Sequence, residues 1–337
     1  MSSIDTVSLR WQRDFPENKD LRADDWQPHY NSRFGNIDKW THNRKGTNLP
    51  RFTWSKPQER ESWLTVEFSA PYLIKGTNAL DADDADVAAA LDLVSDYTSQ
   101  RVGVECDARK ALVGRVDYAA NFNVGQESIP LYLEAALDAK VSRFCLPYRE
   151  SDTAVGLDTG GSRKIQLYDK HADVLNKVES GRLEGNAAKL ALECSLGMLR
   201  LESRFKTTQT VSRLAKSLDV ERTPETLLSS DVAGKVIAME LKKLSLDKPI
   251  EPESERFEAL HEAFGDYKKV SDLLGFLAYR DRFGDNFYRL PQLGISRATY
   301  NRKVKLLQDA GLWLSVASNR ALSALSEVHR TDSRKAA

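Results

Sequence analysis

The chain has 337 residues, of which 41% are hydrophobic and 29% charged, a balance typical of folded globular proteins rather than disordered ones. Its 49 basic and 49 acidic residues give a net charge of zero, which excludes a globally basic nucleic-acid-binding protein. Phosphate would therefore have to bind at local basic surfaces.

Targeting and membrane signals are absent from the sequence. No apolar run approaches the roughly 20 residues that a membrane span needs, and the N-terminus has no signal-peptide pattern. Three widely spaced cysteines without a CxxC pair are expected to be reduced thiols. We therefore expect a cytoplasmic protein without a membrane partner.

Strands and helices are expected to alternate through the first two-thirds of the chain. The expected elements are a strand at 4–11, a strand at 63–69, a helix near 82–101, a strand at 111–122, a helix near 130–139, strands near 141–146, 153–157 and 164–168, a helix near 185–194 and a strand at 198–205. The polar stretch 14–61 yields no element. From Thr207 onward the pattern is helical, apart from the proline-containing segment 247–255.

Four expected strands share one design, in which apolar residues alternate with acids and bases. In the strand at 198–205, for example, Arg200, Glu202 and Arg204 share one face. An antiparallel sheet with one solvated face gives such alternation by itself. Aspartate is depleted in strands, however, so Asp117 in GRVDYAANF needs a positive partner, either a divalent cation or the neighbouring arginines. We expect an α+β fold with an antiparallel-rich central sheet, helices on one face and an open polar face.

The segment RKIQLYDKHADV (163–174) begins as a strand and ends as the first turn of a helix. Tyr168 is a candidate nucleophile, Lys170 can lower its pKa or neutralise a leaving group, and His171 can carry a proton. The alternatives are an aromatic contact, a solvated lysine and a surface histidine. If Asp117, Glu202 and an acid of this segment converge, they form an all-oxygen site suited to Mg²⁺ or Mn²⁺, and flanking arginines would hold phosphates.

Other catalytic templates are missing from the sequence. It contains neither GxxxxGK[ST] nor GxSxG, and no histidine pair has the HxH spacing of strand-nicking relaxases. The glycines of GLDTGGSR (156–163) are typical of a hairpin turn.

The order of three motifs resembles the filamentous-phage replication initiators, the gene II/X family. These motifs are GRVDYAANF, KIQLYDKHADVL and SLGMLRLESRFKT, and the flanking segments IDTVSLRW and TVEFSAPYLIKGTN are also similar to that family. A related arrangement occurs in rolling-circle plasmid initiators. The resemblance covers most of residues 4–218.

This resemblance implies an enzyme for rolling-circle replication in the cytoplasm of a bacterial host. It would nick one strand of double-stranded origin DNA through a tyrosine, leave a 3′-hydroxyl for the host polymerase and rejoin the displaced single strand. The implied metal ligands are Asp117, Asp173 and Glu202, with Glu67 as a further candidate. The implied partners are origin DNA, displaced single-stranded DNA, and the host replication helicase and polymerase, and an oligomer is left open.

Two tyrosines are candidates for the nucleophile. Plasmid initiators carry it in the strand before R-I-Y-D-K, whereas the corresponding segment here, TAVGLDTGG, has none. We therefore expect Tyr168 as the nucleophile, with Tyr148 as the reserve. Arg115, Arg200 and Arg204 are expected to bind DNA. The tryptophan, arginine and histidine residues of 14–61 are expected to contact it too.

A second DNA-binding element is expected near the C-terminus, in LPQLGISRATYNRKVKLLQDAGLW. A turn at Gly294 precedes a helix that is capped by Ser296 and stopped at Gly311. An inner stripe of Tyr300, Val304 and Leu307 would leave polar side chains outward, as in a helix-turn-helix. The outward residues are Arg297, Asn301, Arg302 and Lys305. An ordinary basic amphipathic helix is the alternative.

We thus predict a nicking and joining domain at 1–206, a helical DNA-binding region at 207–325 with a helix-turn-helix-like element at about 285–313, and a disordered tail at 326–337. The alternative function is a sequence-specific DNA-binding regulator of phage replication or transcription without catalysis.

Overall fold

A computed structural model describes residues 2–12, 26–31, 36–42, 48–55, 61–137, 139, 146–158, 161–247, 256–283, 295–310, 312 and 324–328. The chain forms two compact units. Unit 1 contains residues 1–121 and 158–237, and unit 2 contains residues 122–157 and 238–337. This division differs from the predicted boundary at 206/207, because the helices between 208 and 227 belong with the strands of unit 1.

The described residues contain ten strands, and the α+β class with a large antiparallel sheet is confirmed. Eight of these strands lie in the order β2-β3-β4-β5-β1-β6-β10-β9. Their bounds are β1 (Ser2–Gln12), β2 (Gln27–Asn31), β3 (Asn36–His42), β4 (Arg51–Ser55), β5 (Trp63–Ser69), β6 (Leu112–Asn123), β9 (Arg163–Asp169) and β10 (Met198–Phe205). Strands distant in sequence are neighbours, since β1 pairs antiparallel with both β5 and β6.

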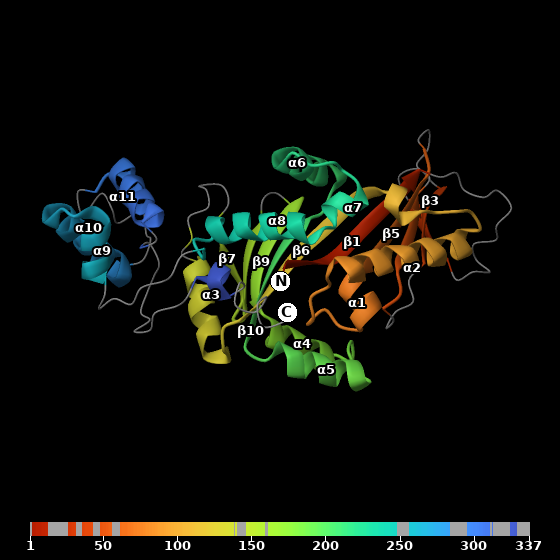
Figure 1. The fold of residues 1–337 in the computed structure, drawn as a ribbon, viewed down its shortest axis with the longest axis horizontal. Coiled ribbons are helices and arrows are strands. Elements are labelled where there is room, and N and C mark those ends of the chain that lie inside the picture. Colours follow the sequence, from red (N-terminus) through yellow and green to blue (C-terminus); the bar gives the residue numbers. More distant parts are fainter. Residues whose placement is uncertain are drawn as a thin grey trace. The chain divides into compact units, whose positions relative to one another are not determined.

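Helices cover the apolar face of this sheet, as the alternation predicted. The helices of unit 1 are α1 (Ala70–Lys75), α2 (Asp84–Val102), α4 (Lys170–Glu179), α5 (Gly185–Ser195), α6 (Thr208–Leu218), α7 (Pro224–Leu227) and the first half of α8 (Ser230–Lys243), with a 3₁₀ turn at Ala108–Lys110. Figure 1 shows α2, α7 and α8 lying across one face of the strands. From that face Tyr118 donates a 2.9 Å hydrogen bond to the carbonyl oxygen of Leu227, and the Phe52 ring packs 5.6 Å from Tyr97 of α2.

The polar stretch 14–61 contains three strands that the sequence pattern did not predict. β4 alternates buried and partly exposed residues. Its Phe52 and Trp54 pack against Trp26, with ring centroids 6.0 and 6.2 Å apart, and His42 lies 5.7 Å from Trp26. The expectation that the tryptophan, arginine and histidine residues of this stretch contact DNA is therefore wrong for Trp26, His42 and Trp54, which are buried in the core.

Unit 2 contains a hairpin and a group of helices. Its elements are a 3₁₀ turn at Gln126–Ser128, α3 (Ile129–Leu137), β7 (Tyr148–Ser151), β8 (Ala154–Asp158), the end of α8, α9 (Arg256–Phe264), α10 (Tyr267–Phe283) and α11 (Arg297–Asp309). The inner stripe of α11 is confirmed, because Tyr300, Val304 and Leu307 pack with α9 and α10 in one apolar cluster. Ser296 caps α11 by accepting a 3.1 Å hydrogen bond from the Thr299 amide.

Several predictions fall outside the described residues. These are the turn at Gly294, the stop at Gly311, the first part of the helix-turn-helix-like element, nearly all of the strand near 141–146 and residues 329–337 of the tail. In the part of the chain that is described, no helix has both the length and the apolar character needed to cross a membrane.

The aromatic cluster of β2–β4 gives a prediction about stability. Trp54→Ala should lower the free energy of unfolding by about 3–5 kcal/mol, because it removes a fully buried ring. The control Tyr30→Ala, in the same sheet but 69% exposed, should change it by less than about 0.5 kcal/mol. Urea titration followed by circular dichroism measures both. Equal losses in the two variants would contradict this packing.

Candidate active site on the polar face of the sheet

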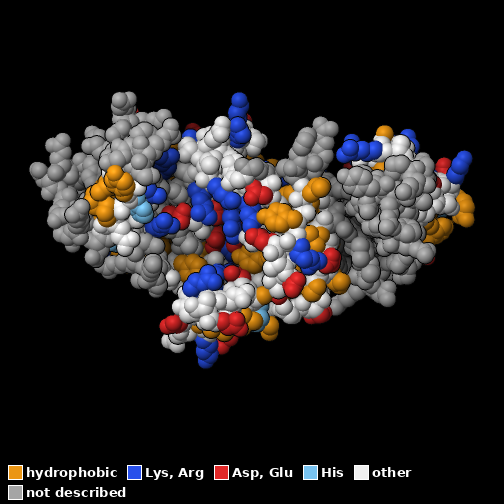
Figure 2. All heavy atoms as spheres, turned by 180° about the vertical axis from the view of Figure 1, so that it is seen from behind, with side chains coloured by type: hydrophobic (Ala, Val, Ile, Leu, Met, Phe, Trp, Pro, Cys, Tyr) orange, Lys and Arg blue, Asp and Glu red, His pale blue; other side chains and the backbone are white. Residues whose placement is uncertain are grey.

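The face opposite α2, α7 and α8 carries the charged residues that the strand alternation predicted. Figure 2 shows this face, with lysine, arginine and acidic side chains gathered near its centre. β9 and β10 are in a register that places Tyr168 opposite Arg200, and Gln166 opposite Glu202. The sequence motifs containing Tyr168 and Glu202 are thus neighbours in space, as expected.

Arg200 is 0% exposed and bonds to several segments of this face. Its guanidinium donates to Glu202 Oε1 at 2.8 Å, to the Asn78 carbonyl at 2.9 Å and to Asn121 Oδ1 at 3.1 Å. Asp5 Oδ1 lies 3.0 Å from its Nη2. Burial opposes the charged guanidinium, but nearby Tyr168, Asp5 and Glu202 outweigh it and raise the pKa of Arg200 well above its ordinary value.

Glu202 and Tyr168 form a direct pair. The Tyr168 hydroxyl donates a 2.6 Å hydrogen bond to Glu202 Oε1, and Arg204 donates to Glu202 Oε2 at 2.6 and 3.0 Å. Burial would raise the pKa of Glu202, but Arg200 and Arg204 hold it well below its ordinary value. Burial, and then the Glu202 charge, raise the pKa of Tyr168 well above 10.0. Tyr168 is therefore a neutral phenol beside an ionised carboxylate.

The turn from β9 into α4 supplies the second group of residues. Asp169 caps α4 by accepting from the amides of His171 and Ala172 at 2.9 and 3.1 Å. Lys170 is fully buried and donates to Asn78 Oδ1 and Asp173 Oδ2, both at 2.9 Å. Burial, with help from nearby Arg200 and Lys177, lowers the pKa of Lys170 to about 8.

His171 does not join this network in the structure. Its Nδ1 lies 3.0 Å from Ser195 Oγ, in the contact between α4 and α5. His171, the predicted proton carrier, therefore contacts Ser195 of α5 and not Tyr168. The physical reason is the helical start at Lys170, which turns successive side chains by about 100° and so separates Lys170 from His171.

Asp117 is the acid of β6 and is bound by the arginine two positions before it. Arg115 donates to Asp117 Oδ1 and Oδ2 at 3.0 and 2.5 Å, and to Glu67 Oε2 at 3.0 Å. Burial outweighs these bonds, and Asp5 adds negative charge, so the pKa of Asp117 rises to about 6. The sequence allowed either a divalent cation or a neighbouring arginine as the positive partner of Asp117, and the structure shows Arg115 in this role.

The three predicted metal ligands do not fit a metal ion as they lie. Both Glu202 oxygens and both Asp117 oxygens accept hydrogen bonds from arginine or tyrosine, and Asp173 Oδ2 accepts from Lys170 and from Lys177, the latter at 2.8 Å. Within the described ranges no three His, Cys, Asp or Glu side chains are arranged to hold a metal ion. A site made by Asp117, Asp173 and Glu202 stays a prediction from the resemblance.

The predicted DNA-binding residues have different exposures. Arg200 is enclosed by its four protein partners, so it orders the site instead of facing DNA. Arg115 and Arg204 keep 27% and 29% of their side chains exposed. The residues predicted on α11 are all exposed, namely Arg297, Asn301, Arg302 and Lys305. Tyr148, the reserve nucleophile, is 41% exposed in the β7–β8 hairpin of unit 2, where its ring lies against Gly156.

Sequence reasoning missed several members of the network. Asp5 and Asn78 bond each other at 3.0 Å across 73 positions, and Asn121 Nδ2 donates to Asp81 Oδ1 at 2.9 Å. Asn121 could have been found, since it shares the strand face of Asp117. Asn78 lies in the loop after α1, where no periodic pattern signals a buried amide.

Family models, curated proteins and solved structures were all compared with this chain, and none of them matches it.

The buried Asp117 gives a prediction about pH. Between pH 3.8 and about 6 the folded protein binds more protons at this carboxyl than the unfolded chain does, so the stability of the folded state falls as pH rises. Relative to Asp117→Asn, the wild type should lose roughly 2–3 kcal/mol of unfolding free energy between pH 4 and 7.

Urea titrations in metal-free buffer across this range measure the difference. Asp96→Asn, which removes an exposed carboxylate from α2, is the control. A wild type that gains stability relative to Asp117→Asn as the pH rises would contradict the inferred burial.

Proposed function

We propose that this protein is a replication initiator that nicks one strand of origin DNA through Tyr168 and later rejoins it. The observation that carries the proposal is the 2.6 Å hydrogen bond from the Tyr168 hydroxyl to Glu202, on a sheet face lined with arginines. The motif order described above supports the same reaction.

The proposed reaction uses this hydrogen bond directly. The Tyr168 Oη atom attacks the phosphorus of a phosphodiester, the P–O3′ bond breaks, and a 5′-phosphotyrosine and a free 3′-hydroxyl are formed. The phenolic proton passes to Glu202 Oε1, and the leaving 3′-oxygen takes a proton from water. Reversal of these steps joins the strand again. Arg204 and Arg115, which are partly exposed, would hold the phosphate oxygens.

Access to Tyr168 is a requirement of this mechanism. The residue is only 8% exposed, so the phosphodiester has to displace a neighbouring side chain to reach it. Arg204 is the natural one, because it is partly exposed and bonds the carboxylate that holds the phenol. An incoming phosphate offers Arg204 an alternative anion, which frees Glu202 to accept the phenolic proton.

Recognition of the origin is assigned to α11. Its outward side suits a duplex, with arginines and a lysine for phosphates and Asn301 for a base edge. The host polymerase would extend the 3′-hydroxyl and a host helicase would unwind the strand. Mg²⁺ or Mn²⁺ belongs to the proposal through the resemblance alone, and the proton transfer above uses protein groups.

A non-catalytic DNA-binding regulator is the second candidate function. The burial of Tyr168 and its raised pKa favour it, because both oppose nucleophilic attack. The basic side of α11 serves both functions equally. The two are distinguished by whether a covalent protein–DNA adduct forms.

Tyr168→Phe tests the proposal. The wild type incubated with supercoiled origin plasmid and Mn²⁺ should give nicked DNA linked to protein on a denaturing gel. Tyr168→Phe should reduce the adduct at least about 10³-fold, because only the attacking oxygen is lost. Tyr148→Phe, the matched control, should retain it. An adduct that survives in Tyr168→Phe but disappears in Tyr148→Phe would move the reaction to Tyr148, and the absence of any adduct in the wild type would favour the regulator.

A further inference from the structure

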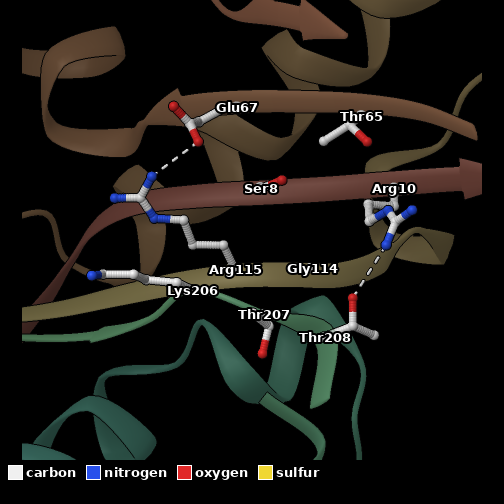
Figure 3. A pocket seen from close by; sticks show the side chains of 9 residues that line it. All are labelled: Ser8, Arg10, Thr65, Glu67, Gly114, Arg115, Lys206, Thr207 and Thr208. Atoms are coloured by element: carbon white, nitrogen blue, oxygen red, sulfur yellow. Dashed lines mark hydrogen bonds and ion pairs between the residues drawn. The ribbon is translucent and has the colours of Figure 1, made fainter. Parts of the chain in front are cut away.

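A hollow of about 480 Å³ opens on the polar face of the sheet. It lies beside β10, the strand that carries Glu202. It is formed by β1, β5, β6, the end of β10 and the start of α6 (Figure 3). Three bases and one acid line it, namely Arg10, Arg115, Lys206 and Glu67. These side chains give the hollow a formal charge of +2, whereas the net charge of the whole chain is zero.

Two of these bases differ from the rest of the polar face. Arg115, Arg200, Arg204, Lys170 and Lys177 all hold a carboxylate. In the described part of the chain, neither Arg10 nor Lys206 has an acidic partner. Arg10 donates a 3.3 Å hydrogen bond to Thr208 Oγ1 (Figure 3). Its guanidinium also lies 4.7 Å from the centre of the Trp63 ring. These two neutral contacts fix the direction of Arg10 and leave its charge uncompensated.

Gly114 makes room for Arg10. A Cβ atom at this position would lie 2.7 Å from Arg10 Cδ, closer than side-chain carbons approach each other, although the backbone of Gly114 is not in the left-handed region. The absence of a side chain at Gly114 is therefore a spatial requirement of the Arg10 position. Gly114 thus leaves space for the Arg10 side chain, and Thr208 and Trp63 contact its guanidinium.

The start of α6 adds further donors to the same hollow. Thr207 caps this 11-residue helix by accepting from the Thr210 amide at 3.2 Å, and Thr208 presents its hydroxyl beside Arg10. The positive end of the helix dipole thus adds to the two uncompensated bases. Charge, hydroxyl donors and an open cavity together suit a tetrahedral oxyanion.

We propose that this hollow is the subsite for a phosphodiester of the DNA strand, held by Arg10 and Lys206. Its identification with DNA rests on the proposed function. Arg115 connects the two sites, because it lines the hollow and bonds Asp117. A strand bound here is positioned by a phosphate distinct from the one that is cleaved, so the subsite contributes to affinity and register and takes no part in proton transfer.

The test measures binding of a short fluorescent oligothymidylate by anisotropy over a range of salt concentrations. For single strands each lost phosphate contact should lower the slope of log K against log [salt] by about 0.7. Arg10→Gln and Lys206→Gln should each lower it by that amount, and the double variant by about 1.4. Lys189→Gln, an exposed lysine of α5, is the control for net charge and should leave the slope unchanged.

Gly114→Ala provides a second test, because it displaces Arg10 without removing a charge. It should weaken binding of the oligonucleotide as Arg10→Gln does, while far-UV circular dichroism stays as in the wild type. A double variant that binds with the slope of Lys189→Gln would overturn the subsite, as would Gly114→Ala with unchanged affinity. Tyr168→Phe should bind with the wild-type slope, because the subsite takes no part in the proposed reaction. Retained nicking by this variant would refute only the proposed reaction and would leave the subsite standing.

Discussion

The arrangement of the polar face depends on one buried cation, the guanidinium of Arg200. Taking a charge out of water costs several kcal/mol unless the charge is paired and fully hydrogen-bonded. Arg200 is paired with the carboxylates of Asp5 from β1 and Glu202 on its own strand, and it donates hydrogen bonds to Glu202, to Asn121 from β6 and to the Asn78 carbonyl from the loop after α1. Its Nη2 approaches Asp5 as an ion pair without hydrogen-bond geometry. Because these partners come from separate segments, a single side chain fixes their positions relative to one another.

The same network explains how one face serves two purposes. Around Arg200 and Lys170 the face is closed by the loop after α1 and by the start of α4, and the charges there are matched within the protein. Toward Arg10 and Lys206 the face is open, and these two bases have no acidic partner among the residues that the structure describes. Glu202 lies between the two regions, with Arg200 on the closed side and the partly exposed Arg204 on the other. A ligand phosphate that draws Arg204 away would alter the closed region through this one carboxylate.

Much of this arrangement followed from two-residue periodicity, which fixes the side of a strand on which each residue lies. The pattern placed Arg200, Glu202 and Arg204 together. The helical period of 3.6 residues, in turn, gave the inner stripe of α11. Periodicity could not give the pairing of Asp5 with Arg200 across the sheet, because register between distant strands depends on tertiary contacts that a local pattern does not contain. β2–β4 were missed for a different reason: they have only five, seven and five residues, so the alternation in a strand such as β4 is too short to stand out from the polar stretch around it.

The central claim is that Arg200 and Glu202 form a strongly coupled buried pair that holds the site together. A double-mutant cycle with Arg200→Met and Glu202→Gln, followed by urea unfolding, measures this coupling directly. We expect a coupling free energy above about 1.5 kcal/mol, against about 0.5 kcal/mol or less for the exposed pair Lys235–Asp231 measured in the same way. A coupling no larger than that of the exposed pair would contradict the account.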